Sequence, residues 1–357
     1  MKPEIRIVRT QAPKPKPPSD SLGFGQYFTD HMFIMDYTAG KGWHDPAIVP
    51  YAPLILDPAA LVFHYGQAVF EGMKSYRSSD GRVLLFRPEK NFERLNTSND
   101  RLCIPCIDND MAIHALIELI KLDADWIPAA EGTSLYIRPF VMATEAVLGV
   151  RPSNFYKFII ILSPVGSYYP QGINPVKICI EDEYVRAVRG GAGYTKGSAN
   201  YAISLKGQVK AGEMGYAQVL WLDGVERKYI EEVGASNIFF KINGELVTPE
   251  LSGSILPGIT RDSVIQLAKS WKIPFAERKI SIEELFEAHD KGMLKEAFGS
   301  GTAAVISPIG EFNWQGRKIT VGDGGIGELT RRIYNELTGI QCGRAPDKFD
   351  WVKVVKI

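Results

Sequence analysis

The sequence predicts an α+β protein of two domains, in which a small α+β domain precedes a larger domain built on a barrel-like sheet. The first observation is the length of 357 residues, which suits two domains that each bury a core of their own. The second is that strand patterns alternate with two amphipathic helical patterns in the first half. The third is a second half dominated by short strand patterns and turns, which favours a barrel-like sheet over a doubly wound one.

The first half is expected to combine strands with helices packed on one side. Residues 1–23 contain the proline-rich stretch QAPKPKPPSD and are predicted to form a flexible, extended arm. Apolar alternation marks the strands, and Pro88 marks the first position of a helix. The expected strands are Met32–Tyr37, Leu61–Tyr65, Val83–Phe86, Ser134–Ala143 and Tyr156–Ser163, and the expected helices are Pro88–Arg101 and Met111–Trp126.

A Gly- and Pro-rich segment, Pro164–Pro175, is predicted to connect the domains. The expected boundaries are 1–170 for the small domain, 171–181 for the connection and 182–357 for the large domain. The second half is expected to contain strands Val176–Ile180, Gln218–Leu222, Ile238–Ile242, Phe275–Lys279 and Ala303–Ile306, with helices Ala199–Ala211, Arg261–Trp271 and Glu328–Leu337.

The composition disfavours several classes of partner. Lys plus Arg and Asp plus Glu both number 41, so the chain lacks the basic excess on which nucleic-acid binding depends. No apolar run is long enough to cross a bilayer and no signal peptide is visible, which predicts a cytoplasmic protein without a membrane partner. Four cysteines do not form a disulfide framework, and Cys103–Cys106 lacks the further ligands that a zinc site requires. We expect no metal, and small molecules are the expected ligands.

The most informative lysine is Lys196, in the small-residue loop GGAGYTKGSAN (Gly190–Asn200) before a predicted helix. Glycine and alanine let a bulky aldehyde approach the amine. A lysine that forms a Schiff base needs its pKa lowered toward neutrality by burial and nearby cations. The loop taken alone fits an ordinary solvated lysine as well.

Three further motifs suggest a phosphate-bearing cofactor. Glu231–Asn237 (EEVGASN) places a carboxylate at the mouth of a buried strand, where it needs a positive partner such as a protonated pyridine nitrogen. Leu256–Asp262 (LPGITRD) precedes a helix whose first N–H groups can bind an anion. Phe298–Ala303 (FGSGTA) is a second Gly-rich segment. Each motif alone also fits an ordinary turn, and none has the dinucleotide-binding GxGxxG context.

Together these segments resemble the branched-chain amino-acid aminotransferases, which are fold type IV pyridoxal-phosphate enzymes. The resemblance runs from about Phe24 to Leu337. Its seven motifs occur in one order: FHYGQAVFEGMKSYR (Phe63–Arg77), LFRPEKNFERL (Leu85–Leu95), GTSLYIRPF (Gly132–Phe140), the Lys196 loop, EEVGASNIF, LPGITR and FGSGTA.

The resemblance implies pyridoxal 5′-phosphate as the cofactor. Lys196 would bind it covalently and later move the substrate proton, Tyr201 would bond its phenolic oxygen, and Glu232 would pair with its pyridine nitrogen. The phosphate would be held by Arg94, by the N–H groups of Ile259 and Thr260, and by Thr302.

The resemblance also implies a substrate site and a homodimer. Tyr65 and the Leu148–Gly149–Val150 loop would reach the neighbouring subunit's site. Ala304 and Ser307 occupy the positions of a redox CxxC found in some relatives, so no such switch is expected. The implied substrate residues are Phe24, Tyr65, Phe70, Tyr136, Arg138, Tyr168, Thr302 and Ala303.

The implied reaction transfers the amino group of Leu, Ile or Val reversibly to 2-oxoglutarate, giving branched 2-oxo acids and glutamate. It would serve the biosynthesis or breakdown of branched-chain amino acids. Two alternatives remain at this point: another fold type IV transaminase that acts on D-amino or aromatic substrates, and a catalytically silent protein that binds a phosphate ligand. Intact Lys196, Tyr201 and Glu232 argue against the second alternative.

Overall fold

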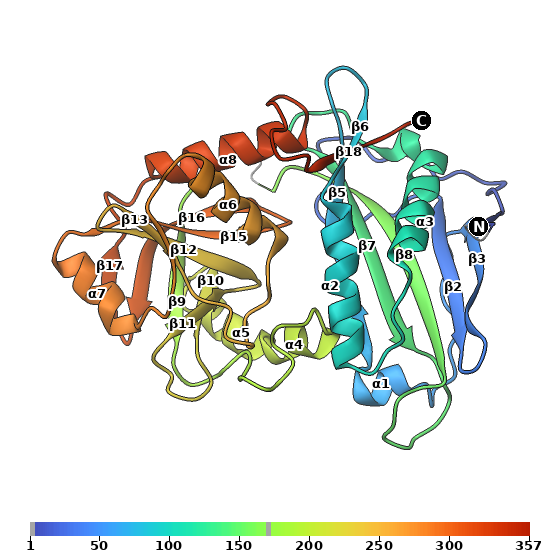
Figure 1. Cartoon of the computed structure of the whole chain (residues 1–357), viewed down its shortest axis with the longest axis horizontal. Coiled ribbons are helices and arrows are strands. Elements are labelled where there is room, and N and C mark those ends of the chain that lie inside the picture. Colours follow the sequence, from blue (N-terminus) through green and yellow to red (C-terminus); the bar gives the residue numbers. More distant parts are fainter. Residues whose placement is uncertain (1–3, 169–172) are drawn as a thin grey trace. The chain divides into compact units, whose positions relative to one another are not determined.

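The computed structural model describes residues 4–168 and 173–357, and the chain forms two compact units (Figure 1). The first unit comprises Met1–Tyr168, Thr195–Ala199 and Gly339–Ile357. The second comprises Tyr169–Tyr194 and Asn200–Thr338. The short segment that carries Lys196 therefore belongs to the first unit, although the residues on either side of it belong to the second. The C-terminal residues 339–357, expected in the large domain, also belong to the first unit.

The first unit is built on a mostly antiparallel sheet in the order β1-β3-β2-β8-β7-β5-β6-β18, with β4 paired to β7. Among its described strands, only β1 and β3 pair in parallel. The strands are β1 (Arg6–Ile7), β2 (His31–Thr38), β3 (Gly42–Pro50), β4 (Ala68–Phe70), β5 (Met73–Arg77), β6 (Val83–Phe86), β7 (Ser134–Ala143), β8 (Phe155–Val165) and β18 (Val352–Val355).

Helices α2 (Pro88–Arg101) and α3 (Asn109–Leu122) lie side by side in front of β7 and β8 (Figure 1). Pro88 stands in the first turn of α2, where a missing N–H costs nothing. Asp108 caps α3 by accepting a hydrogen bond from the Met111 N–H. Phe92 and Leu116 pack into a core with strand residues such as Phe158, which agrees with the α+β class. The helix predicted at Pro88–Arg101 is confirmed, whereas the one predicted at Met111–Trp126 ends at Leu122. A short 3₁₀ turn, Ala124–Trp126, follows α3.

The prediction of a strand at Leu61–Tyr65 was wrong, because these residues form the short helix α1. Gly66 ends it in the left-handed conformation, with φ of 60°. Leu61 is buried, whereas Phe63 and Tyr65 are largely exposed. A mostly apolar run of only five residues fits one turn of helix as well as a strand.

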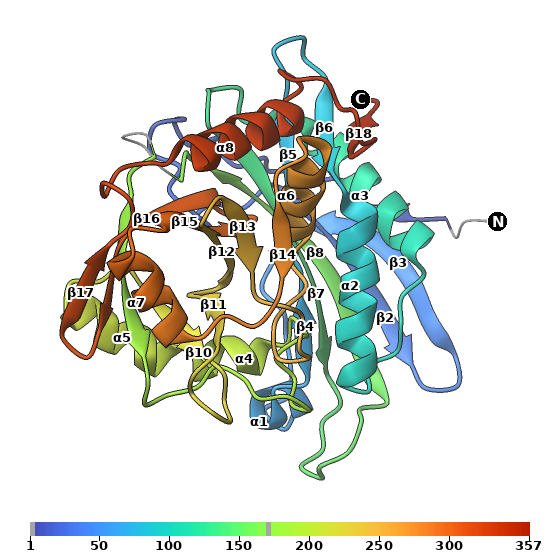
Figure 2. The same ribbon diagram turned by 60° about the vertical axis from the view of Figure 1, so that its left-hand side comes forward.

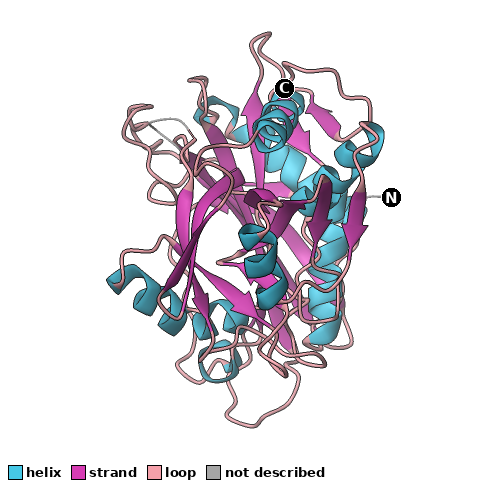
Figure 3. Cartoon of the chain, turned by 90° about the vertical axis from the view of Figure 1, so that its left-hand side faces the viewer, coloured by secondary structure: helices cyan, strands magenta, loops and turns pink. Residues whose placement is uncertain are grey.

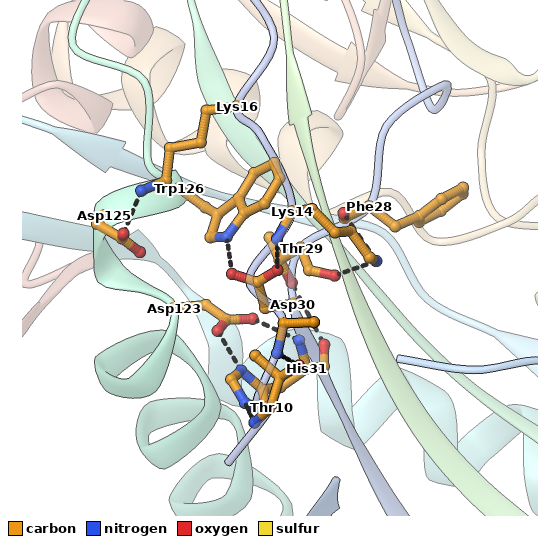
Figure 4. Close-up of polar contacts among 11 residues, drawn as sticks. Thr10, Lys14, Lys16, Phe28, Thr29, Asp30, His31, Asp123, Asp125 and Trp126 are labelled. Atoms are coloured by element: carbon orange, nitrogen blue, oxygen red, sulfur yellow. Dashed lines mark hydrogen bonds and ion pairs between the residues drawn. The ribbon is translucent and has the colours of Figure 1, made fainter. Parts of the chain in front are cut away.

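The N-terminal arm is extended, and hydrogen bonds hold it against the first unit (Figure 4). Lys14 donates to the backbone carbonyls of Phe28 and Thr29, and its own N–H donates to Asp30. His31 accepts from the Thr10 N–H, and its other ring nitrogen is 2.6 Å from Asp123. From about Thr10 to Lys16 the segment expected as a flexible arm is therefore tied to the sheet.

The second unit contains a closed six-stranded barrel in the order β11-β10-β9-β16-β15-β12, because β12 also pairs with β11. Its strands curve around one another in Figures 2 and 3. Strands β13 and β14 extend the sheet from β12, and β17 pairs with β16. The strands are β9 (Val176–Glu181), β10 (Gln218–Leu222), β11 (Ile230–Val233), β12 (Ser236–Ile242), β13 (Glu245–Thr248), β14 (Phe275–Glu277), β15 (Leu294–Gly301), β16 (Val305–Trp314) and β17 (Arg317–Thr320).

Sequence reasoning found most of these elements but misplaced some boundaries. The connection expected at 171–181 includes β9, and its residues 171 and 172 lie outside the described residues. The strand expected at Ala303–Ile306 begins only at Val305, because residues 302–304 form a turn. The helices are α4 (Ser198–Ile203), α5 (Leu205–Glu213), α6 (Ile259–Ser270), α7 (Ile282–Asp290) and α8 (Glu328–Gln341).

Candidate active site

The backbone around Lys196 is fixed from two sides within the first unit. The Lys196 N–H donates to the Ser98 hydroxyl of α2 at 2.9 Å, and its carbonyl accepts from the Phe70 N–H at 3.1 Å. Gly197 also forms an antiparallel bridge with Val69 of β4. Although this loop is rich in glycine, its backbone at Lys196 and Gly197 is therefore fixed against α2 and β4, and this fixes the position from which the Lys196 side chain extends.

Aromatic rings and an arginine surround the Lys196 amine. Its Nζ lies 4.8 Å from the centre of the Phe70 ring. Arg138 stacks on the same ring at 4.7 Å and donates to the Tyr136 hydroxyl at 3.0 Å. Phe24 packs edge-on against Tyr136, with ring centres 4.9 Å apart. The structure thus brings together five residues that the resemblance assigned to the cofactor or substrate.

A buried ion pair lies beside the lysine. Glu71 is fully buried and accepts two hydrogen bonds from Arg94, at 2.7 Å from Nε and 2.9 Å from Nη2. Asn91 of α2 donates to the same carboxylate at 2.8 Å. This bidentate arrangement orients Arg94 and satisfies a charge that would be costly to bury alone.

The network sets the charge state of the amine. Burial first, and then the positive charge of Arg94, lower the pKa of Lys196 from 10.5 to about 8, while Glu71 acts in the opposite direction. Burial would raise the pKa of Glu71, but Arg94, Lys196 and Asn91 hold it below its usual value. A lysine with a pKa near 8 is neutral often enough at physiological pH to attack an aldehyde.

In the second unit, Glu232 of β11 is buried and contacts a cation and a backbone donor. Its carboxylate lies 3.2 Å from Nε of Arg186 and accepts from the Leu256 N–H at 2.8 Å. Arg186 itself is buried and donates to the backbone carbonyl of Ser254. A cation and a backbone donor therefore offset the cost of burying the Glu232 carboxylate.

Strand pairing brings the three Gly-containing motifs of the second unit together. Glu232 pairs with Asn237 across β11 and β12, and Asn237 pairs with Ser300 across β12 and β15. The Asn237 side chain donates to the Leu256 carbonyl at 2.9 Å, and it lies so close to Gly258 that a β-carbon there would clash. The N-terminus of α6 and the turn at residues 302–304 therefore adjoin the strands that flank Glu232.

These two groups of residues fit pyridoxal 5′-phosphate. The first unit offers an amine of lowered pKa beside Arg94, and the second offers a buried carboxylate. The second unit also offers a helix N-terminus at Ile259 and Thr260, where the helix dipole favours an anion such as a phosphate. An amine, a carboxylate and anion-binding groups are the functions that this cofactor requires.

The remaining predicted residues lie on each unit as follows. Tyr201 lies on α4, in the second unit, and Thr302 and Ala303 lie in the turn after β15. Tyr168, half-exposed, ends the first segment of the first unit. Tyr65 on α1 donates a hydrogen bond to the Leu148 carbonyl.

Sequence reasoning missed Glu71, Ser98 and Arg186. Glu71 was detectable as an acid inside the apolar stretch AVFEGM, because a charge there requires a partner. No sequence pattern marks Ser98 or Arg186, because their contacts with Lys196 and Glu232 form only when residues distant in the sequence fold together.

Among residues 4–168 and 173–357, no group of acidic, histidine or cysteine side chains is arranged to hold a metal ion. No helix in that part of the chain is long and apolar enough to cross a membrane. The four cysteines are free, and Cys103 and Cys106 are exposed.

The chain is similar in sequence to known aminotransferases. The profile of the family described as amino-transferase class IV matches residues 68–312. A "Branched-chain-amino-acid aminotransferase 2" from Bacillus subtilis (strain 168) is 61% identical over 98% of this chain and 97% of its own. A "Probable branched-chain-amino-acid aminotransferase" from Staphylococcus aureus (strain N315) is 56% identical over 98% of both chains.

Solved structures show the same similarity. A branched-chain amino acid aminotransferase from Escherichia coli matches with a TM-score of 0.76 and 29% identity, over 92% of this chain and 99% of that one. The T.th. branched-chain amino acid aminotransferase, solved with pyridoxamine 5′-phosphate, matches with a TM-score of 0.75 and 25% identity, over 90% and 98% of the two chains.

Proposed function

The chain belongs to the branched-chain-amino-acid aminotransferases of class IV, and we propose that the residues around Lys196 and Glu232 form its active site. It is a pyridoxal-phosphate-dependent transaminase that exchanges amino groups between branched-chain amino acids and 2-oxoglutarate. The alternatives left open by the sequence are thereby set aside. The observation that carries the site assignment is Lys196, whose backbone is held by Ser98 and Phe70 and whose amine has a pKa of about 8.

Each residue has a proposed part in the reaction. The bound cofactor supplies an electron sink for the bond that breaks at the substrate α-carbon. Lys196 binds the cofactor covalently, and its freed amine then accepts and returns the α-proton as a general base and acid. Glu232 keeps the pyridine nitrogen protonated, and Tyr201 binds the phenolic oxygen. Arg94, oriented by Glu71, binds the phosphate with Ile259, Thr260 and Thr302.

One pocket must accept both leucine and glutamate. We propose that Arg138 binds the side-chain carboxylate of glutamate. The substrate would otherwise be enclosed by Phe24, Phe70, Tyr136, Tyr168, Thr302 and Ala303, and by Tyr65 of the partner subunit. The Nε of Arg138 is buried without a hydrogen-bond partner among the described residues, so its N–H is available to donate to a carboxylate of the substrate. With leucine bound, its bond to Tyr136 and its stacking on Phe70 remain.

We propose that the protein acts as a homodimer in the cytoplasm, in the biosynthesis or breakdown of branched-chain amino acids. Exposed apolar side chains support the dimer: Phe63 and Tyr65 on α1, and Leu148 and Val150 in the loop that Tyr65 contacts. Val150 is 82% exposed, which is unfavourable unless another surface covers it. Size measurement of the holoenzyme tests this proposal, and a monomer at micromolar concentration would refute it.

The site assignment is tested by Lys196→Ala. We expect the variant to lose the visible absorbance of the lysine-bound cofactor and turnover to fall by at least about 10³-fold, because the amine that would attack the aldehyde is removed. The matched control is Lys206→Ala, an exposed lysine in α5, which should keep both properties. A stoichiometric, borohydride-reducible adduct in Lys196→Ala would contradict the assignment.

The role of Arg138 is tested by Arg138→Met, with the two half-reactions followed separately by the cofactor absorbance. A lost charged hydrogen bond of about 1.5–3 kcal/mol corresponds to roughly a 10- to 150-fold fall in kcat/KM. We expect that fall for glutamate and 2-oxoglutarate, and a much smaller one for leucine. Equal losses for glutamate and leucine would show that Arg138 has only a structural part.

A further inference from the structure

A cavity of about 180 Å³ opens in the second unit beside β11. Its walls come from the turn at residues 223–229, the loop at 249–255 and the side chains of Glu231, Arg189 and Lys279. Successive residues of a strand point to opposite faces, so Glu231 turns away from the side on which Glu232 bonds to Arg186 and Leu256. None of the residues assigned above to cofactor or substrate lines this cavity.

The inner wall carries a carboxylate with an unused oxygen. Glu231 is 5% exposed, and its Oε1 accepts a hydrogen bond from the Ser254 hydroxyl. Its Oε2 is buried and has no hydrogen-bond partner in the part of the chain that the structure describes. A buried acceptor without a donor is costly, and an N–H donor of a ligand in the cavity would remove that cost.

The cavity also carries two cations. Arg189 and Lys279 are exposed, and within residues 4–168 and 173–357 neither forms an ion pair. The Lys279 ammonium lies 4.6 Å from the centre of the Tyr229 ring, which also lines the cavity. Three further carboxylates also line the cavity: Glu226, Glu250 and Asp223, of which Asp223 already accepts hydrogen bonds from the backbone N–H groups of its own turn. Arg189 and Lys279 are the groups of the lining that can bind an anionic group on the ligand.

Apolar side chains and the volume define the rest of the ligand. Val225 and Ile255 also line the cavity. An apolar cavity of about 150 Å³ holds a molecule as large as benzene, so 180 Å³ suits a ligand of amino-acid size.

We propose that this cavity binds a free α-amino acid with an apolar side chain, whose ammonium group is bound by Glu231 and whose carboxylate is bound by Arg189 and Lys279. An amino acid carries all three features that the walls complement: a cation, an anion and an apolar side chain. The binding is separate from transamination and does not depend on the role of Lys196.

The test uses holoenzyme in which borohydride has reduced the bond between lysine and cofactor, so that no amino acid is consumed. Binding of radiolabelled L-valine is measured by equilibrium dialysis. We expect a saturable component whose dissociation constant rises at least about 10-fold in Glu231→Gln and in the double variant Arg189→Gln/Lys279→Gln. The control is Lys318→Gln, an exposed lysine on β17 outside the cavity, which should bind like the wild type.

A second ligand isolates the ammonium contact. The acid 3-methylbutanoate lacks the amine, so we expect it to bind at least about 10-fold more weakly than valine and to be insensitive to Glu231→Gln. A crystal of the reduced holoenzyme soaked in L-selenomethionine should show an anomalous selenium peak among Val225, Ile255 and Tyr229. Unchanged valine binding in both cavity variants, or a soaked crystal without that peak, would overturn the proposal. Neither result would bear on the Lys196 site, because transamination is not the readout.

Discussion

Glu71 of the first unit and Glu231 of the second are both buried carboxyl groups, yet their environments differ. Glu71 receives two hydrogen bonds from Arg94 and one from Asn91, and its pKa lies below the usual value. Glu231 receives one from Ser254, and burial raises its pKa from 4.5 to about 7 despite the nearby charge of Arg186. The charge of Arg94, together with the hydrogen bonds that reach the carboxylate, therefore gives Glu71 a lower pKa than Glu231.

The two environments serve different purposes. A fully paired carboxylate such as Glu71 fixes the position of Arg94 and influences the charge of Lys196 without titrating near neutral pH. A carboxylate with few hydrogen bonds, such as Glu231, keeps one oxygen available for a ligand. Its ionisation while buried lowers the stability of the folded protein. Substitutions that remove one carboxylate at a time separate these effects.

The largest effect is expected for Glu71→Gln. Removing one partner of a buried ion pair costs about 3–5 kcal/mol, and because glutamine retains part of the hydrogen bonding we expect a loss of about 3 kcal/mol in the free energy of unfolding. The pKa of Lys196 should fall further below about 8, since Glu71 raises it. Urea unfolding measures the first effect, and the pH dependence of amine labelling at Lys196 measures the second.

The control for Glu71→Gln is Glu93→Gln, which removes an exposed carboxylate from the same helix as Arg94. A Glu71→Gln variant that matched this control in both stability and lysine labelling would show that the buried pair does not organise the site.

An intermediate effect is expected for Glu231→Gln, with the opposite sign. The folded-state pKa is raised to about 7 above an unfolded value of 4.5, so the folded state binds the proton more tightly. The protonated Glu231 carboxyl therefore contributes fully to the free energy of unfolding below pH 4.5, and this contribution is lost as the pH rises through about 7. Because Gln does not titrate, the stability of the variant relative to wild type should increase by roughly 2 kcal/mol between pH 4.5 and 8, allowing for solvent screening.

The measurement for this prediction is urea unfolding of wild type and Glu231→Gln over that pH range, in buffer free of amino acids. The matched control is Glu283→Gln, in the exposed first turn of α7. A stability difference between wild type and Glu231→Gln that stayed constant with pH would mean that the Glu231 carboxyl is paired in solution.

The smallest effect is expected for Lys353→Gln. Lys353 of β18 forms an ion pair with Glu89 of α2 at 2.6 Å, and both side chains are substantially exposed. Exposed pairs typically contribute about 0–1 kcal/mol, so the loss should stay within that range and shrink further at high salt. A loss above about 2 kcal/mol would indicate that β18 depends on this pair for docking to the sheet.

Sequence patterns predicted the elements whose signals are local. The helix Pro88–Arg101 begins at a proline and follows one apolar face, and the strand Gln218–Leu222 is a short apolar run, so both agree with the structure. Leu61–Tyr65 was misassigned because five residues do not distinguish the two periodicities. The pairing that closes the barrel between β11 and β12 depends on strand register, which local patterns do not specify.

For the candidate site, the resemblance supplied the residues that touch cofactor and substrate, and these remain proposals. It did not supply their supports. Glu71, Ser98 and Arg186 act on residues that lie 23, 98 and 46 positions away in the sequence, so only the folded chain reveals them.

The membership of the first unit also has a consequence during synthesis. The sheet of the first unit includes β18, at residues 352–355. The segment that carries Lys196, residues 195–199, also belongs to this unit. At a translation rate of about 5–20 residues per second, the ribosome needs roughly ten seconds or more to progress from the lysine to the last strand. During that interval β6 lacks its neighbouring strand β18. The second unit, whose residues end at 338, can therefore fold before the first unit is complete. Lys196 is therefore synthesised well before the strand that completes the sheet of its own unit.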